Sequence, residues 1–119
     1  MSTMQNGVRV AELEPGLSAP LGLERLYRQG LTDLTPWHLM THDHAVKRMS
    51  GLRQRYTRKY LPFAYRQDND DVACLDPAEP DKVFLVHDFA DDGSEVSHVF
   101  PDFWAWFRRA VEDLIAFDP

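Results

Sequence analysis

The sequence predicts an α+β fold: a mainly antiparallel sheet of about three to five strands with helices packed on it. Residues 83–86 read Val-Phe-Leu-Val, and an apolar run without polar alternation is typical of a strand buried on both faces. A second short apolar run occupies residues 71–75. The connection between the two runs contains two prolines and is too short for a helical crossover. The two runs therefore form an antiparallel hairpin at the centre of the sheet.

Three further extended segments flank this hairpin. Residues 61–65 are predicted as a strand that begins at or just after Pro62 or lies at an edge, because proline lacks the amide hydrogen that a sheet ladder needs. Residues 95–100 alternate and follow the turn Asp-Asp-Gly-Ser, which indicates another antiparallel strand. Residues 37–40 favour a short extended segment.

Three helices are predicted. Residues 21–29 carry apolar side chains on one helical face and are followed by Gly30, a residue that commonly ends helices. Thr41 is a suitable N-cap for a helix that continues to about residue 55, and Asp102 is one for a long C-terminal amphipathic helix. The apolar stripe of this last helix predicts that Phe107 faces the centre of the core. The stripe consists of Phe103, Trp106, Phe107, Ala110, Val111, Leu114 and Ile115.

The N-terminal part of the chain lacks such periodicity. We expect residues 1–20 to be a poorly determined arm, with residues 8–17 as arm or edge strand, because Pro15 and Gly16 interrupt any pattern there. A chain of 119 residues has the usual length of one domain, so residues 1–119 are predicted to form a single domain.

Composition excludes several classes of protein. No apolar run approaches the roughly 20 residues that a membrane helix requires, and the N-terminus shows no cationic start followed by an apolar stretch. We therefore expect a cytoplasmic protein without a membrane partner. Cys74 is the only cysteine, which excludes an internal disulfide. The net charge of −6 also argues against nucleic acid as a partner.

The charges are segregated along the chain. Residues 44–66 contain seven basic residues and no acid, whereas residues 67–97 contain ten acids against Lys82 alone. An acidic surface of this kind attracts a basic partner and speeds association with it. Alternatively, the basic segment packs against the acidic loops and much of the field cancels within the molecule.

Motifs for catalysis are weak. The His-Asp-His segment at residues 42–44 lies on a predicted helix, where its two histidines point about 200° apart and cannot share a metal. His87 and Asp88 leave a small metal-dependent hydrolase as a remote alternative. The cluster at residues 68–71, Asp-Asn-Asp-Asp, either shapes the turn before the strand or contacts a partner. We expect no catalytic residue, no metal and no cofactor.

Four short motifs occur in order: Pro-Phe-Ala at residues 62–64, Asp-Asp at 70–71, His-Asp-Phe at 87–89 and Phe-Trp-x-Trp at 103–106. Their combination and spacing resemble a short bacterial branch of the SUKH superfamily, which includes fungal cell-wall synthesis regulators. The resemblance covers about residues 30–117. It implies an α+β fold and a non-enzymatic binding protein, because bacterial members are regarded as immunity proteins that neutralise polymorphic toxins by direct binding.

The predicted function is therefore that of a cytoplasmic immunity protein whose partner is a toxin domain with a basic surface. The alternative is a housekeeping adaptor that binds a cellular protein. Asp71 and Asp88 lie at strand ends and are expected to be structural. The acids in the connections are expected to face the partner, and they are Asp68, Asp70, Asp91, Asp92 and Glu95.

Overall fold

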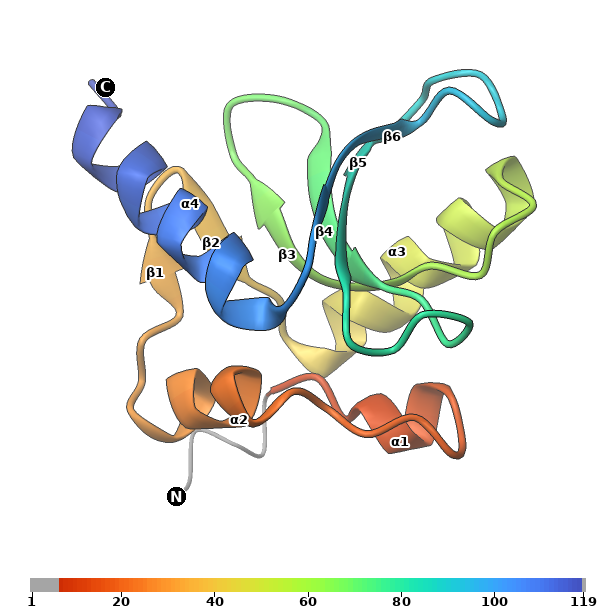
Figure 1. Cartoon of the computed structure of the whole chain (residues 1–119), viewed down its shortest axis with the longest axis horizontal. Helices are drawn as coiled ribbons and strands as arrows, with labels where there is room; N and C mark the ends of the chain where they lie inside the picture. The colour runs from red at the N-terminus through yellow and green to blue at the C-terminus, as the bar shows by residue number, and fades with distance from the viewer. Residues whose placement is uncertain (1–6, 119) are drawn as a thin grey trace.

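The computed structural model describes residues 7–118, and its centre is a six-stranded antiparallel sheet (Figure 1). The strands are β1 (Asp33–Leu34), β2 (Trp37–Leu39), β3 (Leu61–Arg66), β4 (Asp71–Leu75), β5 (Val83–His87) and β6 (Val96–Phe100). Each strand pairs with the next one along the chain. The predicted hairpin is β4–β5, in which Val72 lies opposite Val86. The predicted α+β class and the central hairpin are confirmed.

The predicted number of strands was slightly too low. Residues 33–34 and 37–39 form a small hairpin, β1–β2, and β2 then pairs with β3. Only the second of these segments was expected to be extended. Strands of two and three residues are too short to show alternation, so a pattern of period two cannot reveal them.

Burial across the sheet matches the apolar runs. Four consecutive residues are buried in β4 and in β5, whereas β6 buries only Phe100 and forms an edge. Pro62 lies within β3, between β2 and β4, and not at an edge as one alternative had it. The register shifts between Pro62 and Ala64. Such an irregularity is one of the few interior places where a sheet accepts proline.

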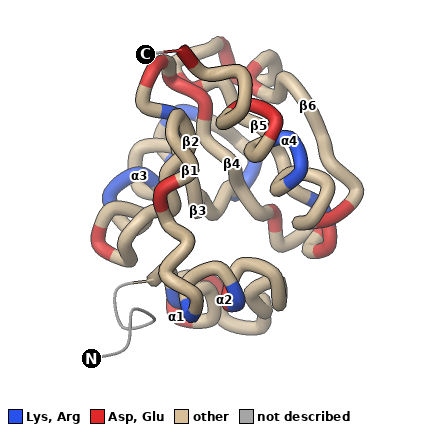
Figure 2. Tube along the Cα trace, turned by 90° about the vertical axis from the view of Figure 1, so that its left-hand side faces the viewer, with Lys and Arg blue, Asp and Glu red and all other residues tan. Residues whose placement is uncertain are grey.

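The helices are α1 (Val10–Leu13), α2 (Leu21–Arg28), α3 (His42–Arg55) and α4 (Phe103–Ala116). Both predicted N-caps are confirmed: the Thr41 hydroxyl accepts from the His44 amide at 3.2 Å, and the Asp102 carboxylate accepts from the Ala105 amide at 2.8 Å. Helices α3 and α4 lie on opposite sides of the sheet, which explains strands buried on both faces (Figures 1 and 2). Within residues 7–118, no helix combines the length and apolar character needed to cross a membrane.

The core-facing side chain of α4 is Trp106, not Phe107 as predicted. Trp106 is fully buried and lies edge-on to Phe63 and Trp37, with ring centroids 5.0 and 5.6 Å away. Phe107 is only partly buried, and Ile115 is 79% exposed. The apolar stripe is therefore wider and longer than the surface it covers, and only the position of the helix on the sheet decides which part is buried.

The segment at residues 8–17 is neither an arm nor an edge strand. It contains the single helical turn α1, and Val8, Val10 and Leu17 are buried in the common core. The spacing of these three residues fits neither helix nor strand, so periodicity could not identify them as core. The rest of the predicted arm includes residues 1–6, which lie outside the described residues.

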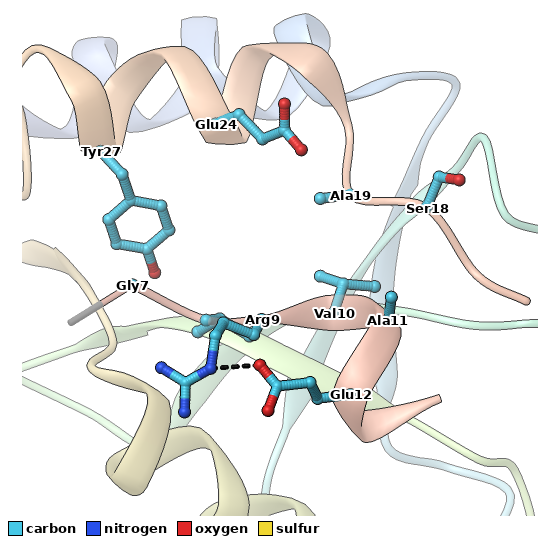
Figure 3. Close-up of a pocket in the computed structure, with 10 residues that line it drawn as sticks. Gly7, Arg9, Val10, Ala11, Glu12, Ser18, Ala19, Glu24 and Tyr27 are labelled. Atoms are coloured by element: carbon cyan, nitrogen blue, oxygen red, sulfur yellow. Dashed lines mark ion pairs between the residues drawn. The ribbon is translucent and has the colours of Figure 1, made fainter. Parts of the chain in front are cut away.

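A hollow of about 340 Å³ lies between this N-terminal segment and α2 (Figure 3). The buried Tyr27 side chain borders it, and its hydroxyl donates to the Met40 carbonyl at 2.7 Å. Burial raises the pKa of Tyr27 to about 12. Arg9 and Glu12 form an ion pair on the other side of the hollow. The Tyr27 ring also packs against Gly7, where an added Cβ would lie 2.9 Å from it, so α2 and the N-terminal segment are in close contact.

The close approach of α2 to α4 gives a first testable prediction. A Cβ added at Gly22 would lie 2.5 Å from the Phe103 ring, a distance that requires the two helices to shift. We expect Gly22→Ala to lower the free energy of unfolding by about 1–3 kcal/mol, as over-packing commonly does. Leu21→Ala, at a neighbouring position 82% exposed, is the control and should unfold with the wild type in urea. Equal midpoints for the two variants would contradict the packing of α2 on α4.

Candidate functional site

The predicted partner-binding acids lie on two neighbouring turns at one end of the sheet. Asp71, at the start of β4, pairs with His87, at the end of β5, so residues 67–70 and 88–95 leave the sheet side by side. The Asp88 amide donates to the Asp70 carbonyl at 3.1 Å and joins the two turns directly. The β5–β6 turn, residues 88–95, also lies beside the C-terminal end of α3 (Figure 1).

Asp88 ties α3 to the β5–β6 turn. Its side chain is fully buried and accepts hydrogen bonds from two arginines of α3 and from its C-cap residue Tyr56. The donors are Arg48 Nε at 3.1 Å, Arg55 Nε and Nη2 at 2.9 and 2.6 Å, and the Tyr56 hydroxyl at 3.0 Å. The expectation that Asp88 is structural is confirmed.

Opposing effects act on the Asp88 carboxyl group. Burial works to raise its pKa, but hydrogen bonds from Arg55, the Phe89 amide and Tyr56 outweigh burial and hold the pKa below its ordinary value. The hydrogen bond to Asp88 in turn raises the pKa of Arg55. The carboxylate and the guanidinium therefore both stay charged at neutral pH, and the turn keeps a fixed ionic anchor.

Phe89 is the most unusual residue of the turn. It has φ = 64°, the only positive value at a non-glycine residue within residues 7–118, and its side chain is 67% exposed. A bulky residue in this conformation is strained by about 1–3 kcal/mol and persists only where its surroundings impose it. Here the Phe89 amide donates to Asp88 at 2.8 Å, and the Arg55 guanidinium lies 4.4 Å from the ring centre. The turn thus holds an aromatic ring in solvent.

Asp70, Asp91 and Asp92 are exposed on the two turns, as predicted. Within the described part of the chain, the side chains of Asp70 and Asp91 form no hydrogen bond or ion pair. Asp92 accepts from the amide and the hydroxyl of Thr57 at 3.1 and 2.7 Å. These hydrogen bonds lower the pKa of Asp92. Asp70 and Asp91 are thus the acids best placed to meet a partner.

Glu95 does not lie on the surface, and the expectation that it is free to face a partner is wrong in this respect. The residue is 5% exposed. Its carboxylate accepts from the Tyr60 hydroxyl at 2.5 Å and from the Gly93 amide at 2.7 Å. Tyr60 is 35 positions away in the sequence, so local composition could not show that the side chain turns inward.

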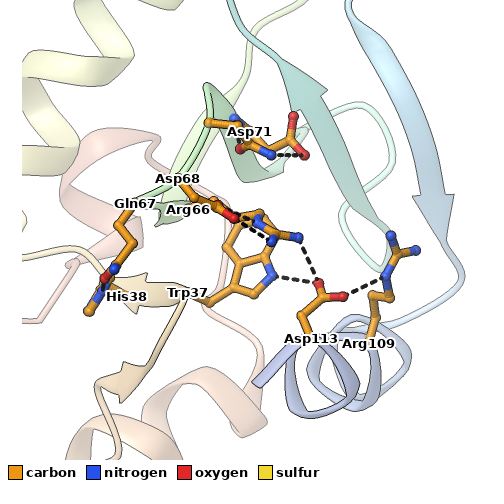
Figure 4. Close-up of polar contacts among 9 residues, drawn as sticks. Trp37, His38, Arg66, Gln67, Asp68, Asp71, Arg109 and Asp113 are labelled. Atoms are coloured by element: carbon orange, nitrogen blue, oxygen red, sulfur yellow. Dashed lines mark hydrogen bonds and ion pairs between the residues drawn. The ribbon is translucent and has the colours of Figure 1, made fainter. Parts of the chain in front are cut away.

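Asp68 is exposed in the β3–β4 turn, as predicted, but Arg66 engages its carboxylate. Two parallel hydrogen bonds of 2.9 Å join the guanidinium to this carboxylate and lower the pKa of Asp68 (Figure 4). Arg66 also reaches Asp113 of α4 at 3.3 Å, and Asp113 accepts from the Trp37 indole at 2.9 Å. Asp68 therefore belongs to a network that joins α4 to the sheet.

The alternative that the basic segment packs against the acidic loops is confirmed for four of its seven basic residues. Five of the seven basic residues of the segment form ion pairs within residues 7–118. The basic segment therefore lies against acidic residues of other elements. The paired residues are Arg48 and Arg55 with Asp88, Arg53 with Glu14, Arg58 with Asp76 and Glu79, and Arg66 with Asp68 and Asp113.

The side chains of His87 and Asp71 contact each other where the two turns leave the sheet. The imidazole Nδ1 lies 2.8 Å from the Asp71 carboxylate, and both this hydrogen bond and the nearby negative charges raise the pKa of His87. The Asp71 amide donates to the Asn69 side chain at 2.8 Å. This contact confirms the expected turn-shaping role within residues 68–71 and the structural role of Asp71.

The raised pKa of His87 predicts a pH effect with a definite sign. Because folding favours protonated His87, the contact stabilises the fold below the unfolded-state pKa of about 6.5. This contribution is lost as pH rises through the folded-state pKa. We expect His87→Gln to unfold at lower urea concentration than the wild type near pH 5.5, and at the same concentration near pH 8.5. A difference of equal size at both pH values would show that the ion pair is not its cause.

The other sites considered from the sequence are structural or incomplete. Within residues 7–118, no three His, Cys, Asp or Glu side chains are placed to hold a metal ion. His42 accepts from the Arg9 amide at 3.0 Å, and the His44 ring lies 4.9 Å from that of Tyr65. Cys74 is fully buried, which raises the pKa of its thiol and makes it part of the core.

Phe89, Arg55 and Tyr56 were not identified as site residues from the sequence. One signal was present: Phe89 is an aromatic residue between Asp88 and Asp91 in a segment with the composition of a turn, where large apolar residues are uncommon. The partners of Asp88 come from a helix more than 30 residues earlier, and no local pattern relates them to the turn.

Comparisons with protein-family models, with curated proteins and with solved structures returned no match.

Proposed function

We propose that this chain is a non-enzymatic protein-binding domain that contacts its partner through the β5–β6 turn. The observation that carries the proposal is Phe89, an exposed aromatic ring in a strained conformation. Strain of this kind is concentrated at functional sites. Aromatic and arginine residues also dominate the energetics of protein interfaces, and Arg55 covers one face of this ring.

The rigidity of the turn supports a binding role. Asp88 is held by Arg48, Arg55 and Tyr56, and the Tyr56 hydroxyl also accepts from the Ala90 amide at 3.1 Å. A ring that is already ordered loses little conformational entropy when a partner covers it. The turn therefore presents a preorganised apolar contact.

The free charges on the two turns favour a basic partner. Asp70 and Asp91 are exposed on the two turns and are not neutralised by an ion pair within residues 7–118. Exposed charges of one sign steer an oppositely charged partner and raise the rate of association. A partner with a basic surface and an apolar pocket fits this site best.

The resemblance to SUKH proteins supports a toxin domain as that partner and neutralisation by direct binding as the function. The first expected observation is a toxin-domain gene next to the gene for this chain. Co-expression with that toxin domain should then restore growth of the host. A gene that instead lies within a biosynthetic operon, with no toxin domain beside it, would favour the adaptor.

Phe89→Ala provides the test at residue level. We expect it to weaken binding of the adjacent toxin domain on the order of 30-fold or more in calorimetry, as the loss of an interface hot spot does. Leu21→Ala is the matched control, because Leu21 is at least as exposed but lies on α2, at the opposite end of the molecule (Figure 1). Unchanged affinity in a folded Phe89→Ala variant would place the interface elsewhere.

A further inference from the structure

A recess of about 440 Å³ opens beside the β5–β6 turn, between it and the chain that follows α3. Glu95 and Tyr60 line it, together with Thr57, Arg58 and Asp92. Glu95 and its Tyr60 partner are almost completely buried, whereas Asp92 is exposed at the surface. The recess therefore has an acidic side chain within it and a second acid at its surface.

Glu95 differs from the other buried acids of the described chain. Asp88 pairs with two arginines, and Arg58 Nε lies 3.0 Å from Asp76 Oδ2, although without the alignment of a hydrogen bond. Glu95 forms no ion pair within residues 7–118 and has only the Tyr60 hydroxyl and the Gly93 amide as donors. Buried carboxylates are normally matched by a cation, because removing a charge from water is costly.

The remaining charged group of the recess does not supply that cation. Arg58 is directed to other acids: it lies within ion-pair distance of Asp76 and reaches Glu79 at 3.3 Å. Its guanidinium also covers the Phe84 ring at 4.6 Å. Tyr60 remains a neutral donor, because burial and the neighbouring Glu95 raise its pKa. The negative charge of the recess is thus not balanced from within the described chain.

We infer that this recess receives the side chain of a lysine or arginine of the partner protein. Each Glu95 oxygen accepts one hydrogen bond in the free protein, and a carboxylate oxygen can accept a second one. An incoming ammonium or guanidinium group would supply the missing positive charge through charge-assisted hydrogen bonds. Asp92 adds an acceptor at the surface. The inference rests on the proposed function and specifies which group of the basic partner enters the site.

The recess can be tested without the partner by titrating the ¹⁵N-labelled protein with Nα-acetyl-arginine amide. Nα-acetyl-citrulline amide, the uncharged analogue, is the matched control probe. We expect saturable shifts of the Thr57 and Gly93 amides with the arginine compound and none with the citrulline compound. Equal shifts with both compounds, or no response to either, would overturn the inference. Because the Phe89→Ala experiment is measured separately, such a failure would leave the proposed function intact.

Two variants assign the binding to Glu95. Glu95→Gln keeps the size of the side chain and an acceptor for Gly93, and should weaken arginine binding about tenfold or more, the loss expected for a charge-assisted hydrogen bond. Glu112→Gln makes the same change at an exposed position on α4, outside the recess, and should change binding less than about twofold, because exposed charges are screened. Asp92→Lys, at an exposed position, places a competing cation beside the recess and should abolish binding. Retained binding in Asp92→Lys or a folded Glu95→Gln would refute the assignment.

Discussion

Trp106→Ala is expected to lower the free energy of unfolding by about 3–5 kcal/mol, a large part of the 5–15 kcal/mol typical of a small domain. The side chain is fully buried and lies against Phe63, Phe103 and Trp37. Removing it deletes the aromatic contact between α4 and the sheet and leaves a cavity in the centre of the core. The midpoint of urea unfolding, read by tyrosine fluorescence or circular dichroism, measures the effect.

Two variants make this expectation specific. Phe107→Ala, at a partly buried position on the same helix, should cost clearly less. Trp106→Phe should also cost less than Trp106→Ala, because it keeps a ring and removes an indole N–H that is buried without a partner within residues 7–118. A larger loss for Phe107→Ala than for Trp106→Ala would mean that α4 lies on the sheet in a different orientation.

The strands and long helices could be predicted because their signals are local. The runs at residues 71–75 and 83–86 contain enough consecutive apolar residues to indicate strands covered on both faces, and they are buried as expected. Thr41 and Asp102 could be identified as caps because a cap requires only a short polar side chain at a helix start. Such features depend on neighbours within one helical turn.

The parts that failed depend on distant residues. Val8, Val10 and Leu17 are buried only because α2 and the sheet approach them, and no regular spacing records this. Trp106 and Phe107 are adjacent on one stripe, so a helical pattern assigns both to the core. Which one reaches the centre depends on where α4 crosses the sheet.

The candidate site shows the same division. Local sequence correctly places Asp68, Asp70, Asp91 and Asp92 in exposed connections. It could not reveal that Glu95 turns inward toward Tyr60, nor that Arg66 engages Asp68. Charge counted along a chain indicates where acids are abundant, but ion pairs formed in the fold decide which of them remain free.

Asp88→Asn is expected to produce the largest combined effect on stability and binding. It leaves Arg48 and Arg55 beside a neutral amide, and removing one partner of a buried ion pair costs about 3–5 kcal/mol. We expect the lower end of this range, because the side chains of the two arginines are 23% and 29% exposed. The loss should appear as a lower midpoint of urea unfolding at neutral pH.

Asp88→Asn should also release Phe89 from its positive φ, because the ionic anchor that opposes the strain is weakened. In the folded variant, the Phe89 amide should then exchange with solvent faster than in the wild type. The affinity for the toxin domain should fall, as it is expected to do in Phe89→Ala.

Asp91→Asn provides the control, because it removes a carboxylate of the same turn that has no ion pair within residues 7–118. It should leave both stability and exchange at Phe89 unchanged. If Asp88→Asn lowered stability while exchange and affinity stayed at wild-type values, Asp88 would be an anchor of α3 alone, and the exposed ring would be held by the rest of the turn.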